Sequence, residues 1–122
     1  MKKIIAVDDK QDLLFTLKIV IEYFNDEYEV TALDSGKKLF QLLKKETPDL
    51  ILLDIMMPDI NGWDIHKKLK STKKWSKIPI IFISSVADDT SKITANSIGD
   101  DFIEKPFDSY DLKQKIENIL NR

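Results

Sequence analysis

Residues 50–62 read LILLDIMMPDING, and this stretch decides the fold. Four consecutive large aliphatic residues precede Asp54, and the chain breaks a few residues later at Pro58. A short, continuous apolar run of this kind is typical of a parallel strand that is buried on both faces. A carboxylate is among the side chains that cost most to bury, so a buried strand that ends in an acid needs a reason. We therefore interpret Asp54 as a candidate functional residue.

Length and composition limit what that acid can do. The 122 residues fit one domain, 1–122, and leave no room for a second one. A hydrophobic fraction of 43% and a charged fraction of 33% are typical of a soluble globular protein. No apolar run approaches the roughly 20 residues that span a bilayer, and the N-terminus does not resemble a signal peptide. We expect a cytoplasmic protein without a membrane partner.

The same counts exclude several kinds of site. The chain has no cysteine, which excludes disulfides and thiolate metal sites, so a metal would be held by oxygen atoms or by the single histidine, His66. We expect His66 itself to be a solvated surface residue, because Lys67 and Lys68 follow it. The net charge of −2 argues against direct nucleic-acid binding.

Hydrophobic periodicity predicts strands and helices in alternation. Continuous apolar runs at 4–7, 50–53 and 80–83 indicate inner strands, and mixed runs at 29–33 and 102–104 indicate edge strands. Helical patterns cover 13–24, 39–43, 62–71, 89–98 and 112–120, with Ser35 and Asp108 at N-cap positions. Polar residues make 89–98 the weakest of these helices. The pattern predicts a doubly wound α/β fold, a three-layer (βα)5 sandwich with five parallel strands in the order 2-1-3-4-5.

Ligands of such a sheet bind beyond the carboxyl ends of the strands. The residues at or just after the predicted strand ends are Asp8, Asp9, Asp54, Ser84, Ser85 and Lys105. Three carboxylates at one rim repel each other unless a cation joins them. Mg²⁺ suits this set, because it prefers oxygen ligands and keeps several waters. We predict a Mg²⁺ site here.

Each of these residues also has a purely structural explanation. The acid pair could be a solvated strand end, Ser84 a helix cap, and Lys105 a solvated loop lysine. Asp54 could be an N-cap, but the following residues 55–58 are no helix start. Lys105 precedes a proline, which holds its backbone extended. The convergence of acids, a hydroxyl and an amine on four strand ends favours a functional site.

Over nearly its whole length the chain resembles the CheY-like receiver domains of two-component response regulators, which have a flavodoxin-like fold. The matching residues are the acid pair Asp8-Asp9, the phosphoacceptor Asp54 in LLDIMMPDING, the hydroxyl residue Ser84, the lysine Lys105 in EKPF, and the switch aromatic Phe102. The resemblance implies that a sensor histidine kinase or a histidine phosphotransfer protein phosphorylates Asp54. It also implies that Asp9, Asp54 and the backbone carbonyl of Met56 bind Mg²⁺, that Asp8 assists, and that the Lys105–Pro106 bond is cis.

The resemblance further implies a switch rather than a turnover enzyme. Ser84 would bind the new phosphoryl group and Phe102 would turn inward. The fourth helix, fifth strand and fifth helix would then contact a downstream effector or output domain, with the chain a monomer or a homodimer through that face. Some residues depart from the family pattern: Lys10 follows the acid pair, Ser85 replaces a smaller residue, and Asp100 interrupts the familiar Gly-Ala-Asp.

Other functions fit less well. A phosphatase of the haloacid-dehalogenase type needs a second acid two residues after the nucleophile, and Met56 stands there. The three glycines, Gly36, Gly62 and Gly99, are too far apart for a phosphate-binding loop. The alternative that stays open is a receiver-like interaction module that is never phosphorylated.

Overall fold

The structure is a computed structural model that describes residues 1–84 and 101–121. Its strands form one parallel sheet in the order β2-β1-β3-β4-β5, which confirms the predicted order. The strands are β1 (Lys2–Val7), β2 (Tyr28–Leu33), β3 (Leu50–Asp54), β4 (Ile80–Ser84) and β5 (Asp101–Glu104). The described helices are α1 (Gln11–Phe24), α2 (Gly36–Leu43), α3 (Gly62–Ser71) and α5 (Ser109–Leu120). The helix predicted over 89–98 lies outside the described residues.

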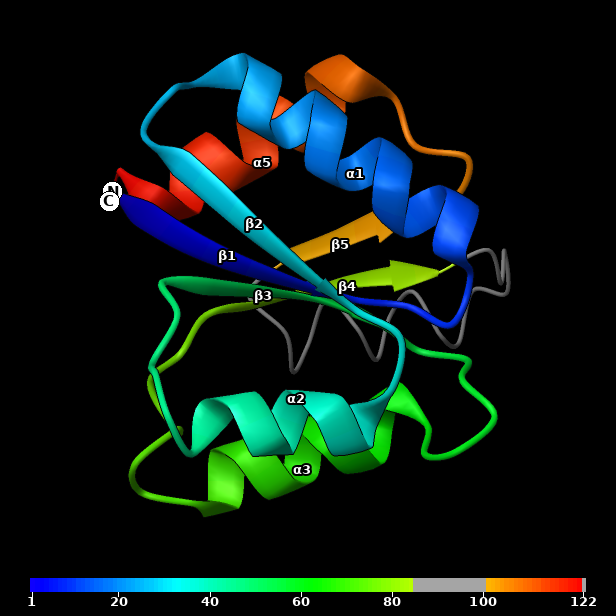
Figure 1. The fold of residues 1–122 in the computed structure, drawn as a ribbon, viewed down its shortest axis with the longest axis vertical. Helices are drawn as coiled ribbons and strands as arrows, with labels where there is room; N and C mark the ends of the chain where they lie inside the picture. Colours follow the sequence, from blue (N-terminus) through cyan, green and yellow to red (C-terminus); the bar gives the residue numbers. More distant parts are fainter. Residues whose placement is uncertain (85–100, 122) are drawn as a thin grey trace.

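Helices cover both faces of the sheet. α1 and α5 lie on one face, and α2 and α3 lie side by side on the other (Figure 1). Successive strand residues point to opposite faces, so Ile4 and Ala6 pack under α1 and α5, whereas Ile5 and Val7 pack with α2 and α3. β3 and β4 are buried along their whole length, and the edge strands β2 and β5 are partly exposed. The predicted inner and edge strands are confirmed.

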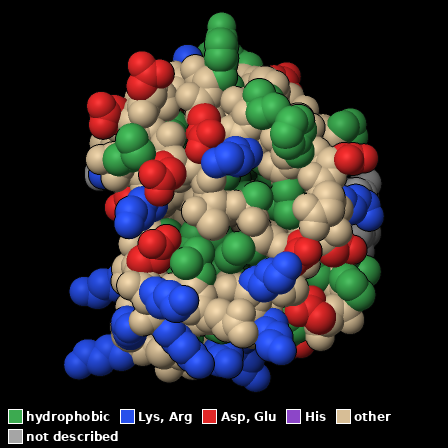
Figure 2. Space-filling model, viewed as in Figure 1, with side chains coloured by type: hydrophobic (Ala, Val, Ile, Leu, Met, Phe, Trp, Pro, Cys, Tyr) green, Lys and Arg blue, Asp and Glu red, His purple; other side chains and the backbone are tan. Residues whose placement is uncertain are grey.

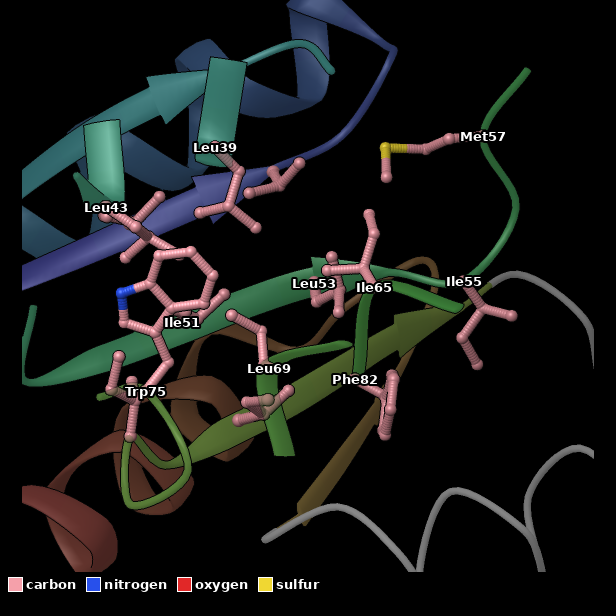
Figure 3. Close-up of a cluster of buried hydrophobic side chains, with 14 of the residues drawn as sticks. Leu39, Leu43, Ile51, Leu53, Ile55, Met57, Ile65, Leu69, Trp75 and Phe82 are labelled. Carbon is pink, nitrogen blue, oxygen red and sulfur yellow. The ribbon is translucent and has the colours of Figure 1, made fainter. Parts of the chain in front are cut away.

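The core on the α2 and α3 face is shown in Figure 3. Leu39 and Leu43 of α2 meet Ile65 and Leu69 of α3 above the apolar side chains of β3. Trp75, which follows α3, closes this core, with its ring centroid 5.7 Å from that of Phe40. The core therefore holds α2 and α3 firmly against the strands that end in Asp54 and Ser84.

His66 belongs to this core, so the expectation of a solvated histidine is wrong. Its side chain is only 8% exposed, and its ring lies 5.3 Å from the ring of Phe82. The buried positions of α3 are 62, 65, 66 and 69, which form one helical stripe. His66 is on this stripe, and the lysines that follow it are on the other side of the helix.

The helix caps and the surface follow the sequence pattern. The hydroxyl of Ser35 accepts a hydrogen bond from the N–H of Lys38, and the carboxylate of Asp108 accepts one from the N–H of Tyr110. Lysines gather over α2 and α3, as Figure 2 shows, and those at 67, 68, 73, 74 and 77 are exposed. None of the described helices is both long and apolar enough to cross a membrane.

Candidate functional site

The carboxyl ends of β1 and β3 bring three acids together. Asp8 follows β1 directly, Asp9 comes next, and Asp54 is the last residue of β3. Because β1 and β3 are paired and parallel, these strand ends meet at the same edge of the sheet. One carboxylate oxygen from each acid lies within 4.8 Å of the others. Asp8 is 1% exposed and Asp54 is 3% exposed, so two of the three charges are buried.

Lys105 connects two of these acids. Its Nζ lies 2.7 Å from Oδ2 of Asp8 and 3.3 Å from Oδ1 of Asp54. The backbone N–H of Lys105 donates to the carbonyl of Ser84 at 2.8 Å, which ties the residue to the end of β4. The bond between Lys105 and Pro106 is cis, as the family resemblance implied. Lys105 is thus held at the acid cluster by its backbone, which is bonded to β4, and by its ammonium, which pairs with the acids.

Burial and charge act on Asp54 in opposite directions. Removal of the carboxylate from water, together with the negative charge of Asp8, raises the pKa of Asp54 from its ordinary value of 3.8 to about 6. The ammonium of Lys105 and the N–H of Met56, which donates to Oδ1 of Asp54, lower this pKa. The effects that raise the pKa are larger than those that lower it. In the metal-free protein at neutral pH the ionised form of Asp54 is therefore less favourable than the same carboxylate in water.

The acid cluster fits a magnesium ion. Oδ1 of Asp9 is buried and has no hydrogen-bond partner in the described part of the chain. A buried acceptor without a partner is costly unless a cation or a water binds it. Carboxylate oxygens are the ligands that Mg²⁺ prefers, and the described residues place no thiol or imidazole in this cluster.

The loop that follows β3 is fixed by a glycine. The N–H of Gly62 donates to the carbonyl of Ile55 at 2.7 Å, which folds the loop 55–61 back onto the strand end. A Cβ atom at Gly62 would stand 2.6 Å from the carbonyl oxygen of Asp54 and 2.7 Å from Cα of Ile55. Only glycine permits this close approach of two backbone segments. Within the loop Met57 is buried, whereas Met56 is 62% exposed.

Ser84 and Phe102 lie outside the acid cluster, on β4 and on β5 respectively. Ser84 ends β4 and is fully buried, one residue beyond Ile83, which pairs with Asp54. Phe102 of β5 pairs with Phe82 and is 6% exposed, so its side chain points into the core of the α2 and α3 face. Ser85 and Asp100, which depart from the family pattern, lie outside the described residues.

Two contacts of this region have no signal in the sequence. The N–H of Gly36, the first residue of α2, donates to Oδ2 of Asp59 in the loop after β3 at 3.2 Å. The side-chain amide of Gln11 donates to Oδ2 of Asp34 at 2.9 Å. Asp59 lies within LLDIMMPDING, but the motif does not indicate that this acid contacts another element. Asp34 belongs to no recognisable motif, and one of the two donors is a backbone group, so residue types alone could not reveal these contacts.

Comparison with known proteins agrees with this geometry. The family model described as the response regulator receiver domain matches residues 4–117. The chain belongs to this family. It is therefore a signalling domain of the two-component type, with the flavodoxin-like fold that the family shares.

Individual relatives support the assignment. The chain is similar to the response regulator SaeR of Staphylococcus aureus, with 37% identity over 123 residues that cover 100% of this chain and 52% of SaeR. The receiver domain thus spans about half the length of the curated relatives it matches. A putative response regulator from Chloroflexus aurantiacus has a TM-score of 0.90 and 27% identity, covering 99% of this chain and 98% of that one. The BeF3-activated DrrB receiver domain has a TM-score of 0.85 and 26% identity, covering 100% and 99%.

Proposed function

We propose that residues 1–122 act as one receiver domain that accepts a phosphoryl group on Asp54 from a sensor histidine kinase or a histidine phosphotransfer protein. The observation that carries this proposal is the position of Lys105, whose ammonium contacts both Asp54 and Asp8. A cation held beside a buried carboxylate can screen an anionic phosphoryl group as it approaches that carboxylate. Family membership supports the same role.

In this reaction the carboxylate of Asp54 attacks the phosphorus of a phosphohistidine. A P–O bond forms as the P–N bond breaks, and the imidazole nitrogen of the donor keeps the electron pair. Phosphoryl transfer needs mainly positioning and charge stabilisation, which the Lys105 ammonium supplies on one side. Asp9, Asp54 and the carbonyl of Met56 would hold Mg²⁺, with Asp8 assisting, and the ion would neutralise charge on the phosphoryl oxygens. The chain is a phosphoacceptor and turns over no separate substrate.

Phosphorylation would be read out at a distance from Asp54. The hydroxyl of Ser84 would donate to a phosphoryl oxygen and draw the end of β4 toward Asp54. This shift would act on Phe102, which lies in the neighbouring strand. A charge change would thereby become a packing change in a face that includes β5 and α5 and, by family likeness, the helix predicted over 89–98, which lies outside the described residues. This face would contact an output domain, an effector or a second copy.

Mass spectrometry after incubation with acetyl phosphate and Mg²⁺ tests the proposal. We expect the wild-type protein to gain the mass of one phosphoryl group, because acetyl phosphate is a small-molecule donor that needs no kinase surface. The Asp54→Asn variant should gain none, and omission of Mg²⁺ should abolish the gain in the wild type. An unmodified wild-type protein that is folded and binds Mg²⁺ would instead favour the alternative, an interaction module that is never phosphorylated.

The readout face gives a second prediction. Beryllofluoride, a phosphoryl mimic, should shift backbone NMR signals over residues 84–110 in the presence of Mg²⁺, because the change at Ser84 propagates to β5. The relative DrrB is itself described as BeF3-activated. Shifts limited to the acid cluster and the loop 55–61 would contradict the proposed switch.

The exposed side chain of Met56 gives a third prediction. It lies two residues after Asp54 and carries no polar atom that could orient an attacking water. Val86, which would lie near the phosphoryl group by family likeness, has none either and lies outside the described residues. We expect slow autodephosphorylation. The measurement is the decay of the phosphorylated mass over time. The Met56→Asn variant should lose its phosphoryl group faster, whereas a wild-type half-life of seconds would refute the expectation.

A further inference from the structure

We infer that Asp59 is a positioning residue for the magnesium site, because it ties the loop 55–61 to the start of α2. This inference rests on the proposed function, since it concerns the same site. Asp59 does not belong to the acid cluster. Its carboxylate Oδ2 accepts a hydrogen bond at 3.2 Å from the N–H of Gly36, the first residue of α2. That N–H is one of the helix-terminal donors that no carbonyl inside the helix can satisfy.

The hydrogen bond between Asp59 and Gly36 is supported by a contact of the next residue, Ile60. A Cβ atom at Gly36 would stand 2.5 Å from Cγ2 of Ile60, so the Ile60 side chain rests directly on the glycine. Met57, two residues before Asp59, is buried in the same core as Leu39 of α2 (Figure 3). Residues 59 and 60 of the loop are therefore fixed to α2 by one hydrogen bond and one apolar contact. The loop is closed by the N–H of Gly62, which donates to the carbonyl of Ile55, the residue that follows β3.

The same turn that begins α2 also contacts the acid-pair loop. The N–H of Asp8 donates to the carbonyl of Leu33 at 3.1 Å, and the side-chain amide of Gln11 donates to Asp34 at 2.9 Å. Asp34 is held in turn by Lys38, whose Nζ lies 2.7 Å from its Oδ1. The segment 33–36 thus contacts both the loop that carries Asp8 and Asp9 and the loop that follows Asp54.

This arrangement matters because the proposed ligands come from two separate loops. Asp9 lies after β1, whereas Asp54 and Met56 lie at and after β3. A site whose ligands are already held in place loses less conformational entropy when the ion binds. The segment 33–36 hydrogen-bonds to both loops, through the N–H of Asp8 and through Asp59. Among the described side chains of the loop 55–61, that of Asp59 is the only one that hydrogen-bonds to this segment. Loss of this contact should weaken ion binding without removing a ligand.

Isothermal titration of Mg²⁺ into the full chain tests the inference. We expect the Kd of Asp59→Ala to rise roughly three- to tenfold, the range that corresponds to the loss of one hydrogen bond. Asp59→Asn keeps an oxygen acceptor and loses only the charge, so its Kd should stay near that of the wild type. Asp64→Ala is the matched control: it removes the same charge from a nearby exposed position whose side chain makes no hydrogen bond among the described residues.

Amide hydrogen exchange of the metal-free proteins provides the second readout. The N–H of Gly36 should exchange faster in Asp59→Ala than in Asp59→Asn or in Asp64→Ala, whereas amides of β1 and β3 should keep their protection. Equal Kd values for Asp59→Ala and the wild type would overturn the inference alone. The same holds if Asp59→Asn weakens binding as much as Asp59→Ala, since charge would then be the cause. A wild-type protein that binds no Mg²⁺ would overturn the proposed function together with the inference.

Discussion

Replacement of Lys105 by methionine is expected to lower the free energy of unfolding of the metal-free protein by about 3–5 kcal/mol at pH 8. The side chain of Lys105 is 12% exposed, and its ammonium pairs with the buried carboxylates of Asp8 and Asp54. Methionine keeps much of the apolar stem but leaves both acids without a cation. Removal of one partner from a buried ion pair is costly, because the remaining charge has lost its compensation and is still out of water.

Urea denaturation with EDTA present measures this effect. Lys113→Met is the control, because the side chain of Lys113 is 42% exposed and its Nζ lies 3.9 Å from Oε1 of Glu117 on α5. Such a surface pair is worth at most about 1 kcal/mol. The loss caused by Lys105→Met should shrink at pH 5, where Asp54 takes up a proton, and should also shrink when saturating Mg²⁺ replaces the missing cation. A loss as small as that of the control would show that Lys105 does not hold the buried acids.

The second large effect is a gain in stability. Asp54→Asn should raise the free energy of unfolding of the metal-free protein by about 3 kcal/mol at pH 8, because the pKa shift from 3.8 to about 6 corresponds to this amount at 1.36 kcal/mol for each pKa unit. The amide is nearly the same shape as the carboxylate, but it carries no charge to be buried or repelled by Asp8. The variant that lacks the proposed phosphoacceptor should thus be the more stable protein.

The pH dependence gives the sign of this effect. The pKa of Asp54 is higher in the folded protein than in the unfolded chain, so the folded state binds more protons between about pH 3.8 and 6. The contribution of Asp54 to the free energy of unfolding therefore becomes more favourable as the pH falls from 7 to 4. Above pH 7 the destabilisation caused by its buried charge is fully present. The difference between the wild type and Asp54→Asn should be largest at pH 8, should have become small at pH 4, and is gone only below the unfolded pKa of 3.8.

Thermal melts from pH 4 to pH 8 with EDTA measure this difference. Asp26→Asn, at an exposed position, is the control and should follow the wild-type curve. With saturating Mg²⁺ the advantage of Asp54→Asn should shrink at pH 8, because the ion compensates the charge in the wild type. If Asp54→Asn is no more stable than the wild type at pH 8, the charge of Asp54 does not destabilise the folded protein as its burial indicates.

The fold was predictable because its strands carry a strong pattern. β3 and β4 are continuous apolar runs that are buried throughout, and a run of that kind has few alternatives to an inner parallel strand. The caps at Ser35 and Asp108 were predictable because their oxygen atoms satisfy donors at a known position of a helix. The convergence of Asp8, Asp9 and Asp54 followed from the strand order alone, since parallel strands end at one edge.

What could not be predicted depends on tertiary neighbours. The sequence does not show that Lys105 contacts Asp8 more closely than Asp54, because the distances depend on how the chain after β5 packs. The burial of His66 was missed because the two lysines after it suggested solvent, although the helical spacing of 62, 65, 66 and 69 was available as a signal. The tether at Asp59 was missed because its donor is the backbone of another element.

The edge strand β5 has a mechanical consequence. Phe102 and Ile103 are consecutive, and they point to opposite faces of the sheet: the first belongs to the core with α2 and α3, the second to the core with α1 and α5. A displacement of this short strand must therefore strain both cores at once. The movement of this one strand of four residues would therefore alter the packing of the helices on both faces of the sheet. A protein bound to either helical layer would contact a changed surface.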